Sequence, residues 1–197
     1  IGEIAKENNI IFHTDAVQAF GHIKIDVKKI GADMLSASSH KFHGPKGCGF
    51  LYADKNTGIK PFIYGGGQER GQRSGTENVP GILGMVKAAE ISHRIMDENN
   101  RKLRKINDYM TDRILNEIDD CICNGNRENR LSNNINVSFG NIDGKALLVL
   151  LDMEGVYVSG ASACNGGKEK SYVLSSLGVP EKYADGTIRM TMDYTMN

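Results

Sequence analysis

The sequence predicts an α/β layered fold followed by a smaller α+β unit. Up to about residue 80, short apolar runs of strand length alternate with polar or helical segments, which is typical of a layered sheet. From Gly81 onward, one long amphipathic segment is followed by short mixed elements. This change of character predicts two domains, residues 1–80 and residues 81–197.

Three strands and one long loop are predicted before this boundary. Residues 10–14, IIFHT, form an apolar run, and residues 33–38 and 48–53 are two further strand candidates. Residues 16–20 are expected to open a helix. Residues 64–80, YGGGQERGQRSGTENVP, combine five glycines with no apolar periodicity, so they predict a loop.

After the boundary, the patterns predict helices and strands in turn. Apolar residues recur on one face from residue 81 to about residue 118, so a long helix is expected there. Residues 133–139, NNINVSF, alternate between polar and apolar and predict a strand. Asp143 is expected to cap a helix that runs through Met153. The remaining predictions are a strand at 156–158, a helix at 171–177 and a strand at 187–192.

Composition narrows the classes of function. Lys+Arg and Asp+Glu both number 24, so the net charge is zero and neither nucleic acid nor an anionic membrane is expected as a partner. No apolar run reaches the ~20 residues that span a bilayer. The four cysteines have neither metal-site spacing nor the density of a disulfide framework, so we expect no metal and a reducing, cytoplasmic compartment.

The start of the chain predicts a piece of a longer protein. The first residues, IGEIAKENNI, have no initiator Met and no targeting pattern, and their apolar spacing is helical. A processed or renumbered complete chain is the alternative.

One lysine has unusual neighbours. In SASSHKFHGPKGCGF, residues 36–50, Lys41 stands between two histidines and before a glycine-rich turn. A lysine amine is a nucleophile only when it is deprotonated. Ser38 and His40 are candidate phosphate ligands, and Asp15, after a strand, is suited to keep a pyridinium nitrogen protonated. Taken singly, a surface lysine and a helix-capping aspartate are the commoner explanations.

The combination of motifs resembles a known family. HTDAVQAFG, SASSHKFHGPKGCGFLY and GGGQERGQRSGTEN, in this order, look like the pyridoxal-phosphate-dependent cysteine desulfurases of the class V aminotransferase group. The resemblance covers the chain from Ile1 to about Thr191. It implies the C-terminal part of such an enzyme: the second half of a fold-type I large domain, with a mostly parallel sheet and helices, then a small α+β domain.

The resemblance implies a role for each residue of the lysine site. Lys41 is the residue that binds pyridoxal phosphate covalently and later moves the substrate proton. Asp15 pairs with the pyridine nitrogen, and Gln18 contacts the phenolic oxygen of the cofactor. Ser38 and His40 bind the phosphate.

The glycine-rich loop carries one further implied role. Thr76, in RSGTEN, matches the residue that reaches the phosphate on the partner subunit, which implies a homodimer with shared sites. Taken alone, the loop is better explained as a flexible connection.

A cysteine in a loop of small polar residues is the second predicted reactive group. Cys164 lies in SGASAC, between a predicted strand and a predicted helix. A buried structural cysteine is the usual alternative, but the small polar neighbours disfavour burial. The family carries its catalytic cysteine in SGSAC on this loop, so the resemblance implies that Cys164 is the nucleophile, although the arrangement differs by one residue.

An arginine near the C-terminus is the predicted substrate ligand. Arg189 lies in GTIRMTM, a predicted strand, and its guanidinium is suited to a bidentate grip on a carboxylate. The resemblance places the arginine that binds the substrate carboxylate here. Without it, a solvent-facing strand arginine is the default.

Together these residues imply that L-cysteine is converted to alanine and a persulfide on Cys164. The sulfur would pass to an iron–sulfur scaffold or another acceptor protein, for cluster assembly, tRNA thiolation or thio-cofactor synthesis. By the resemblance, the family's N-terminal half is absent, so we expect this chain alone to be at most weakly active. A selenocysteine lyase or related class V enzyme, and a non-catalytic fragment acting in assembly or binding, stay open as alternatives.

Overall fold

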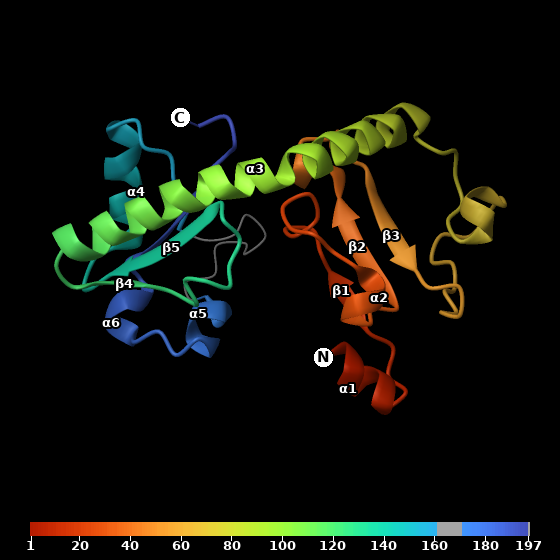
Figure 1. Ribbon diagram of the computed structural model, residues 1–197, viewed down its shortest axis with the longest axis horizontal. Helices are drawn as coiled ribbons and strands as arrows, with labels where there is room; N and C mark the ends of the chain where they lie inside the picture. Colours follow the sequence, from red (N-terminus) through yellow and green to blue (C-terminus); the bar gives the residue numbers. More distant parts are fainter. Residues whose placement is uncertain (161–170, 197) are drawn as a thin grey trace. The chain divides into compact units, whose positions relative to one another are not determined.

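The computed structural model describes residues 1–160 and 171–196 and divides the chain into two compact units (Figure 1). The first unit is Ile1–Asp97 and the second is Glu98–Asn197. The division falls inside α3 (Val79–Glu117), a helix of 39 residues. The domain boundary predicted near residue 81 falls at the start of this helix, and it stays a prediction about the domains of the whole protein.

The first unit is built on a three-stranded sheet in the order β1–β2–β3 (Figure 1). Its strands are β1 (His13–Asp15), β2 (Met34–Ser38) and β3 (Gly49–Ala53). β1 and β2 are parallel, and the segment between them contains the short helix α2 (Val27–Ile30). The α/β class predicted from the sequence is confirmed.

This sheet is mixed, whereas the sequence resemblance implied a mostly parallel one. β2 and β3 pair antiparallel, with Ser38 opposite Gly49. Only residues 39–48 connect them, and a parallel crossover needs a dozen residues or more. Residues 16–20 form hydrogen-bonded turns instead of the expected helix, with the Phe20 N–H donating to the Ala16 carbonyl at 2.8 Å.

One face of the first sheet forms the core of its unit. Leu35 and Ala37 alternate with the polar residues of β2 and are 2% and 5% exposed. They pack with Ala16 and with Phe50 of β3. Neighbouring buried positions come from α3, where Met85 and Ala88 pack against Phe42.

α3 begins where its sequence favours a helix start. The Asn78 side chain accepts the Gly81 N–H at 3.2 Å, as an N-cap residue does. Pro80 stands in the first turn, where its missing N–H costs no intrahelical bond. The buried residues of α3 recur every three or four positions, as on one face of a helix, but several of them are polar and so lie outside the apolar pattern that predicted the helix: Met85, Ala88, Ser92 and Met96 in the first unit, and Leu103, Asn107 and Thr111 in the second.

The second unit contains an antiparallel sheet in the order β4–β5–β6. Its strands are β4 (Cys121–Cys123), β5 (Asn134–Phe139) and β6 (Thr187–Thr191). β5 and β6 agree with the strands predicted at 133–139 and 187–192. β4 was not predicted, because three residues are too few to show an alternation. Residues 156–158 form no strand, and only the isolated bridge between Ser159 and Arg189 follows them.

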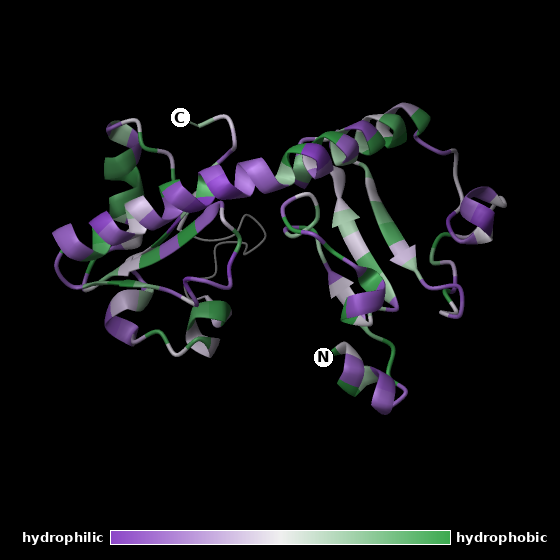
Figure 2. Ribbon diagram, viewed as in Figure 1, coloured by the Kyte–Doolittle hydropathy of each residue, from purple (hydrophilic) through white to green (hydrophobic). Residues whose placement is uncertain are grey.

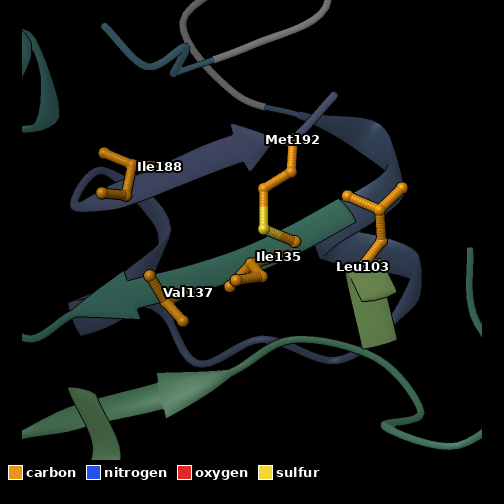
Figure 3. Packing of buried hydrophobic residues seen from close by; sticks show 5 residues of the cluster. All are labelled: Leu103, Ile135, Val137, Ile188 and Met192. Carbon is orange, nitrogen blue, oxygen red and sulfur yellow. The ribbon is translucent and has the colours of Figure 1, made fainter. Parts of the chain in front are cut away.

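The core of the second unit lies on one face of this sheet (Figure 3). Ile135 and Val137 of β5 are 0% exposed, and Leu103 of α3 packs against them. Ile188 and Met192 complete the group of labelled side chains. Met190 of β6 also packs against this core, while the alternating residues Asn136, Arg189 and Thr191 are polar.

Besides α2 and α3, four further helices accompany the two sheets in the described residues, three of them at predicted positions. α4 (Gly144–Met153) begins at Asp143, whose carboxylate accepts the N–H groups of Lys145 and Ala146. α5 (Tyr172–Ser176) lies within the predicted helix 171–177. α1 (Gly2–Glu7) lies where the spacing of the first residues is helical, and α6 (Glu181–Ala184) was not predicted. None of the described helices is long and apolar enough to cross a membrane.

Candidate functional site

Three predicted cofactor residues lie where β1 and β2 end. Asp15 is the last residue of β1, and Ser38 is the last residue of β2. Because these strands are parallel, their carboxyl ends lie at the same edge of the sheet, where α/β proteins place their ligands. Lys41 follows in η1 (Ser39–Phe42), a single turn of 3-10 helix that begins directly after β2.

Strand alternation places the polar residues on the face opposite the core. Asp15 is in register with Ser36, and the buried Leu35 and Ala37 alternate with Ser36 and Ser38. The polar face of the sheet thus carries a carboxylate and two hydroxyls beside the turn that bears the lysine.

The Asp15 carboxylate also shapes the turn that follows it. One of its oxygens accepts the Val17 N–H at 2.8 Å. Gln18 lies in this turn and is exposed, as is Asp15. Both predicted contacts to the cofactor ring therefore start from one short, ordered segment.

Ser38 and His40 form a hydrogen-bonded pair. Ser38 Oγ lies 2.9 Å from His40 Nδ1. His40 is exposed, and Lys41 beside it is half-buried. While this bond is kept, the pair has one donor left for a phosphate oxygen if the imidazole is neutral, and two if both ring nitrogens are protonated.

η1 is anchored on both sides of Lys41. The Ser39 N–H donates to the Cys48 carbonyl at 3.0 Å, and the Phe42 side chain is 1% exposed. Gly44 allows the tight turn that follows, because a Cβ at this position would collide with Ser39 Oγ. The glycine after the lysine motif therefore has a steric explanation.

Two histidines join this site without having been predicted. His22 Nε2 lies 3.0 Å from the backbone oxygen of Lys41, and His13 Nε2 lies 3.1 Å from Ser36 Oγ. No sequence pattern indicates either contact, since each joins residues that are far apart in the chain. Of the two contacts, only that of His13 could be inferred from the register of β1 and β2, and this register is known only when the two strands are paired.

The remaining predicted cofactor residue, Thr76, is exposed in the loop between η2 (Gln68–Gly71) and α3. Arg73, in the same loop, donates to the Gly75 carbonyl at 2.6 Å and so helps to order it. The predicted contact of Thr76 with a partner subunit stays a prediction.

Arg189 belongs to the second unit, where β6 places it opposite Asn136 of β5. Its backbone N–H and C=O both pair with Ser159, at 2.6 and 3.0 Å. Within the part of the chain that the structure describes, its buried Nε has no hydrogen-bond partner. Buried donors are normally paired, so an open guanidinium N–H suits an anion such as a carboxylate.

Cys164, the predicted nucleophile, lies outside the described residues. The described chain leads to it through Ser159, which is paired with the predicted carboxylate-binding residue on the neighbouring strand. Of the other cysteines, Cys121 donates from Sγ to the carbonyls of Ile114 and Ile118. Burial raises its pKa, and the negative charges of Asp119 and Asp120 add to the effect.

A separate cavity in the second unit contains none of the predicted site residues. It measures about 500 Å³ and is lined by Arg104, Asp108, Arg127 and Glu128. The Arg104 guanidinium donates hydrogen bonds to backbone carbonyls, including that of Arg130 at 3.0 Å. Among residues 1–160 and 171–196, no group of three or more His, Cys, Asp or Glu is arranged to hold a metal ion.

The lysine site fits pyridoxal phosphate by the chemistry of its donors. Ser38 and His40 suit the phosphate, and Asp15 suits the pyridinium nitrogen. The Lys41 amine has no hydrogen-bond or ion-pair partner among the described residues, so it is available to an aldehyde.

The chain belongs to the aminotransferase class-V family, whose profile matches residues 1–196. Within this family it is similar to cysteine desulfurases. It is 51% identical over 193 residues to cysteine desulfurase IscS of Methanosarcina thermophila, covering 98% of this chain and 48% of that protein. With cysteine desulfurase IscS of Dictyoglomus turgidum the identity is 50% over 193 residues, covering 98% and 49%.

Solved structures give the same result. The NifS-like protein of Rickettsia africae superimposes with a TM-score of 0.87 at 33% identity, covering 100% of this chain and 52% of its own. A second NifS-like protein has a TM-score of 0.87 at 38% identity, covering 98% and 50%. The chain thus spans about half the length of the curated relatives it matches. That it corresponds to their C-terminal part stays a prediction.

Proposed function

We propose that this chain is part of a pyridoxal-phosphate-dependent cysteine desulfurase. The observation that carries the proposal is the grouping of Lys41, Asp15 and the Ser38–His40 pair at one edge of the first sheet. Identities near 50% to cysteine desulfurases over almost the whole chain support it. A related solved structure, 35% identical, is described as SspA in complex with cysteine, which supports cysteine as the substrate.

In this proposal each residue of the lysine site has a defined task. Bound pyridoxal phosphate supplies the electron sink that makes the substrate α-proton acidic. Ser38 and His40 would hold its phosphate, and the Asp15 carboxylate would pair with its ring nitrogen. The Lys41 amine holds the cofactor before substrate arrives and then accepts the proton from the substrate α-carbon. Gln18 lies in the turn after Asp15, where its amide would contact the ring oxygen.

Two residues of the C-terminal half of the chain, Arg189 and Cys164, carry out the transfer of sulfur. Arg189 binds the carboxylate of L-cysteine through its unpaired guanidinium N–H. Cys164, as the thiolate, attacks the substrate sulfur, so the carbon–sulfur bond breaks, a sulfur–sulfur bond forms and alanine is released. The persulfide sulfur would then pass to an acceptor protein for iron–sulfur cluster assembly or thiolation.

The assembly is part of the proposal as well. Thr76 reaches the phosphate of a partner subunit, so the working enzyme is a homodimer. Its cysteine content is that of a protein of the reducing cytoplasm. The rest of the cofactor cleft comes from the half of the relatives that this chain does not span, and we expect this chain alone to be at most weakly active. An inert assembly fragment and a selenocysteine lyase are the competing functions.

The test is reductive trapping of the cofactor. Pyridoxal phosphate is added, the mixture is reduced with borohydride, and labelled lysines are mapped by mass spectrometry. We expect the label on Lys41 and its loss in Lys41→Ala, while the exposed Lys46 serves as internal control. A full-length protein without label on Lys41 would refute the proposal.

Incubation of the full-length protein with L-cysteine tests the sulfur step. We expect a persulfide that Cys164→Ala abolishes, and a persulfide that survives this change reassigns the nucleophile. Selenocysteine as the better substrate would favour the lyase. Label in the full-length protein but not in this chain would support the inert fragment.

A further inference from the structure

The turn that carries Lys41 depends on contacts from outside. A single turn of 3-10 helix has few hydrogen bonds of its own, and their geometry is poor. Ser39 and Phe42 anchor its two ends, as described above, and His43 ends it with a φ of 67°. The peptide group that follows Lys41 lies between these anchors.

His22 holds this peptide group. Its Nε2 lies 3.0 Å from the Lys41 carbonyl oxygen in a part-buried setting. A carbonyl oxygen can only accept a hydrogen bond, so Nε2 carries the proton and donates it. The neighbouring carbonyl, that of Phe42, accepts a second bond from Ser92 Oγ at 3.3 Å.

The segment that contains His22 is fitted to the turn. Phe20 packs edge-on against Phe42, with ring centroids 4.9 Å apart. Gly21 has a φ of 83°, and a Cβ there would come within 2.6 Å of Phe42 Cβ. Only glycine therefore allows the chain to approach closely enough for His22 to reach Lys41.

We propose that His22 is a positioning residue for Lys41, an inference that rests on the proposed function of this lysine. The bond to the Lys41 carbonyl restrains the backbone ψ angle of Lys41, and this angle helps to set the direction in which the side chain leaves the turn. A well-directed amine meets the cofactor aldehyde beside the Ser38–His40 pair more often than a freely rotating one does. A single neutral hydrogen bond corresponds to roughly a two- to tenfold change in the fraction of molecules whose Lys41 amine points toward the cofactor aldehyde.

The test compares two lysine reagents on the intact protein and three variants. Pyridoxal phosphate with borohydride requires the organised site, whereas formaldehyde with cyanoborohydride requires only exposure. Labelling is quantified by mass spectrometry as the ratio of Lys41 to the exposed Lys46. His22→Leu removes the donor, His22→Gln keeps a donor near the same place, and His93→Leu changes an exposed histidine of α3 as the matched control.

In His22→Leu we expect the pyridoxal phosphate ratio to fall roughly two- to tenfold. The formaldehyde ratio should rise, because the half-buried lysine is released. His22→Gln should restore both ratios to within about twofold of the unaltered protein, and His93→Leu should leave them unchanged. General loosening of the fold would also lower the first ratio and raise the second, but His22→Gln would not restore them.

Two results would overturn the inference: unchanged ratios in His22→Leu, or an equal change in the leucine and glutamine variants. Absence of pyridoxal phosphate label on Lys41 in the unaltered protein would refute the proposed function instead. The formaldehyde ratio would still decide then whether His22 orients the lysine. If His22→Leu does not fold, His22→Ala is measured in its place, with melting temperature as the check.

Discussion

At the residue scale, Asp120 in the second unit connects three elements through two short side-chain hydrogen bonds. Asp120 receives hydrogen bonds from Lys182 Nζ and Tyr183 Oη, both at 2.7 Å. Both bonds lower the pKa of the Asp120 carboxyl, and the bond from Lys182 has the larger effect. Asp120 thereby ties the end of α3 and β4 to α6.

The lowered pKa of Asp120 predicts an acid-sensitive contribution to stability. A carboxyl group with a lower pKa in the folded state stabilises the protein above its unfolded pKa of about 3.9, and the contribution disappears as the pH falls through the folded pKa. We expect Asp120→Asn to melt at a slightly lower temperature than the unaltered protein at pH 7, with the difference vanishing at pH 2. Asp119→Asn, at the neighbouring exposed carboxylate, should show no such difference at pH 7. A gap that persists undiminished at pH 2 would contradict this explanation.

At the element scale, helix starts were recognised where a cap residue stands before an apolar run. Asp143 is the clearest example: its carboxylate accepts the Lys145 N–H at 2.8 Å and the Ala146 N–H at 3.2 Å. α4 is coloured mostly as hydrophobic in Figure 2, yet Val149, Leu150 and Met153 are more than half exposed. On the face of α4 that carries these residues, burial therefore stabilises the helix little, and the cap contributes more to its stability.

Removing the α4 cap should have a measurable cost. We expect Asp143→Ala to lower the free energy of unfolding by about 1 kcal/mol, because two N–H groups lose their acceptor. Asp143→Asn keeps a capping oxygen and should lose less. Asp152→Ala, at an exposed position of the same helix, is the control. Denaturant unfolding at neutral pH measures all three, and equal losses in the alanine and asparagine variants would show that charge rather than capping matters.

The elements that could not be predicted are short or depend on pairing. β4, α2 and α6 contain three or four residues each, which is less than two periods of any pattern. The direction of β3 depends on the length of its connection to β2, and the resemblance alone implied a mostly parallel arrangement. The bridge between Ser159 and Arg189 requires a pairing that no local pattern identifies.

At the scale of the whole molecule, the chain has a separate core in each compact unit. Leu35 is 2% exposed in the first unit, and Ile135 is 0% exposed in the second. Local stability is expected to follow these cores, since amide exchange in native proteins proceeds through cooperative substructures.

Cavities placed in the two cores should therefore act separately. We expect Leu35→Ala and Ile135→Ala each to cost about 2–5 kcal/mol in the unit that contains the change. Native-state hydrogen exchange should show faster exchange in β2 for the first variant and in β5 for the second. The amides of α3 are left out because this helix belongs to both units. Equal acceleration in both sheets by either variant would show that the two units unfold as one.

The sequence by itself determined the α/β class, the long helix, the capped helix α4 and the lysine motif, because each depends on residues that are close together in the chain. The family resemblance added roles for Lys41, Asp15 and Arg189. Tertiary structure decided the mixed order of the first sheet, the burial of Arg189 Nε without a partner among the described residues, and the bond from His22 to Lys41. These features join segments whose separation is set by strand register and loop length, and a local pattern of polar and apolar residues carries no information about either.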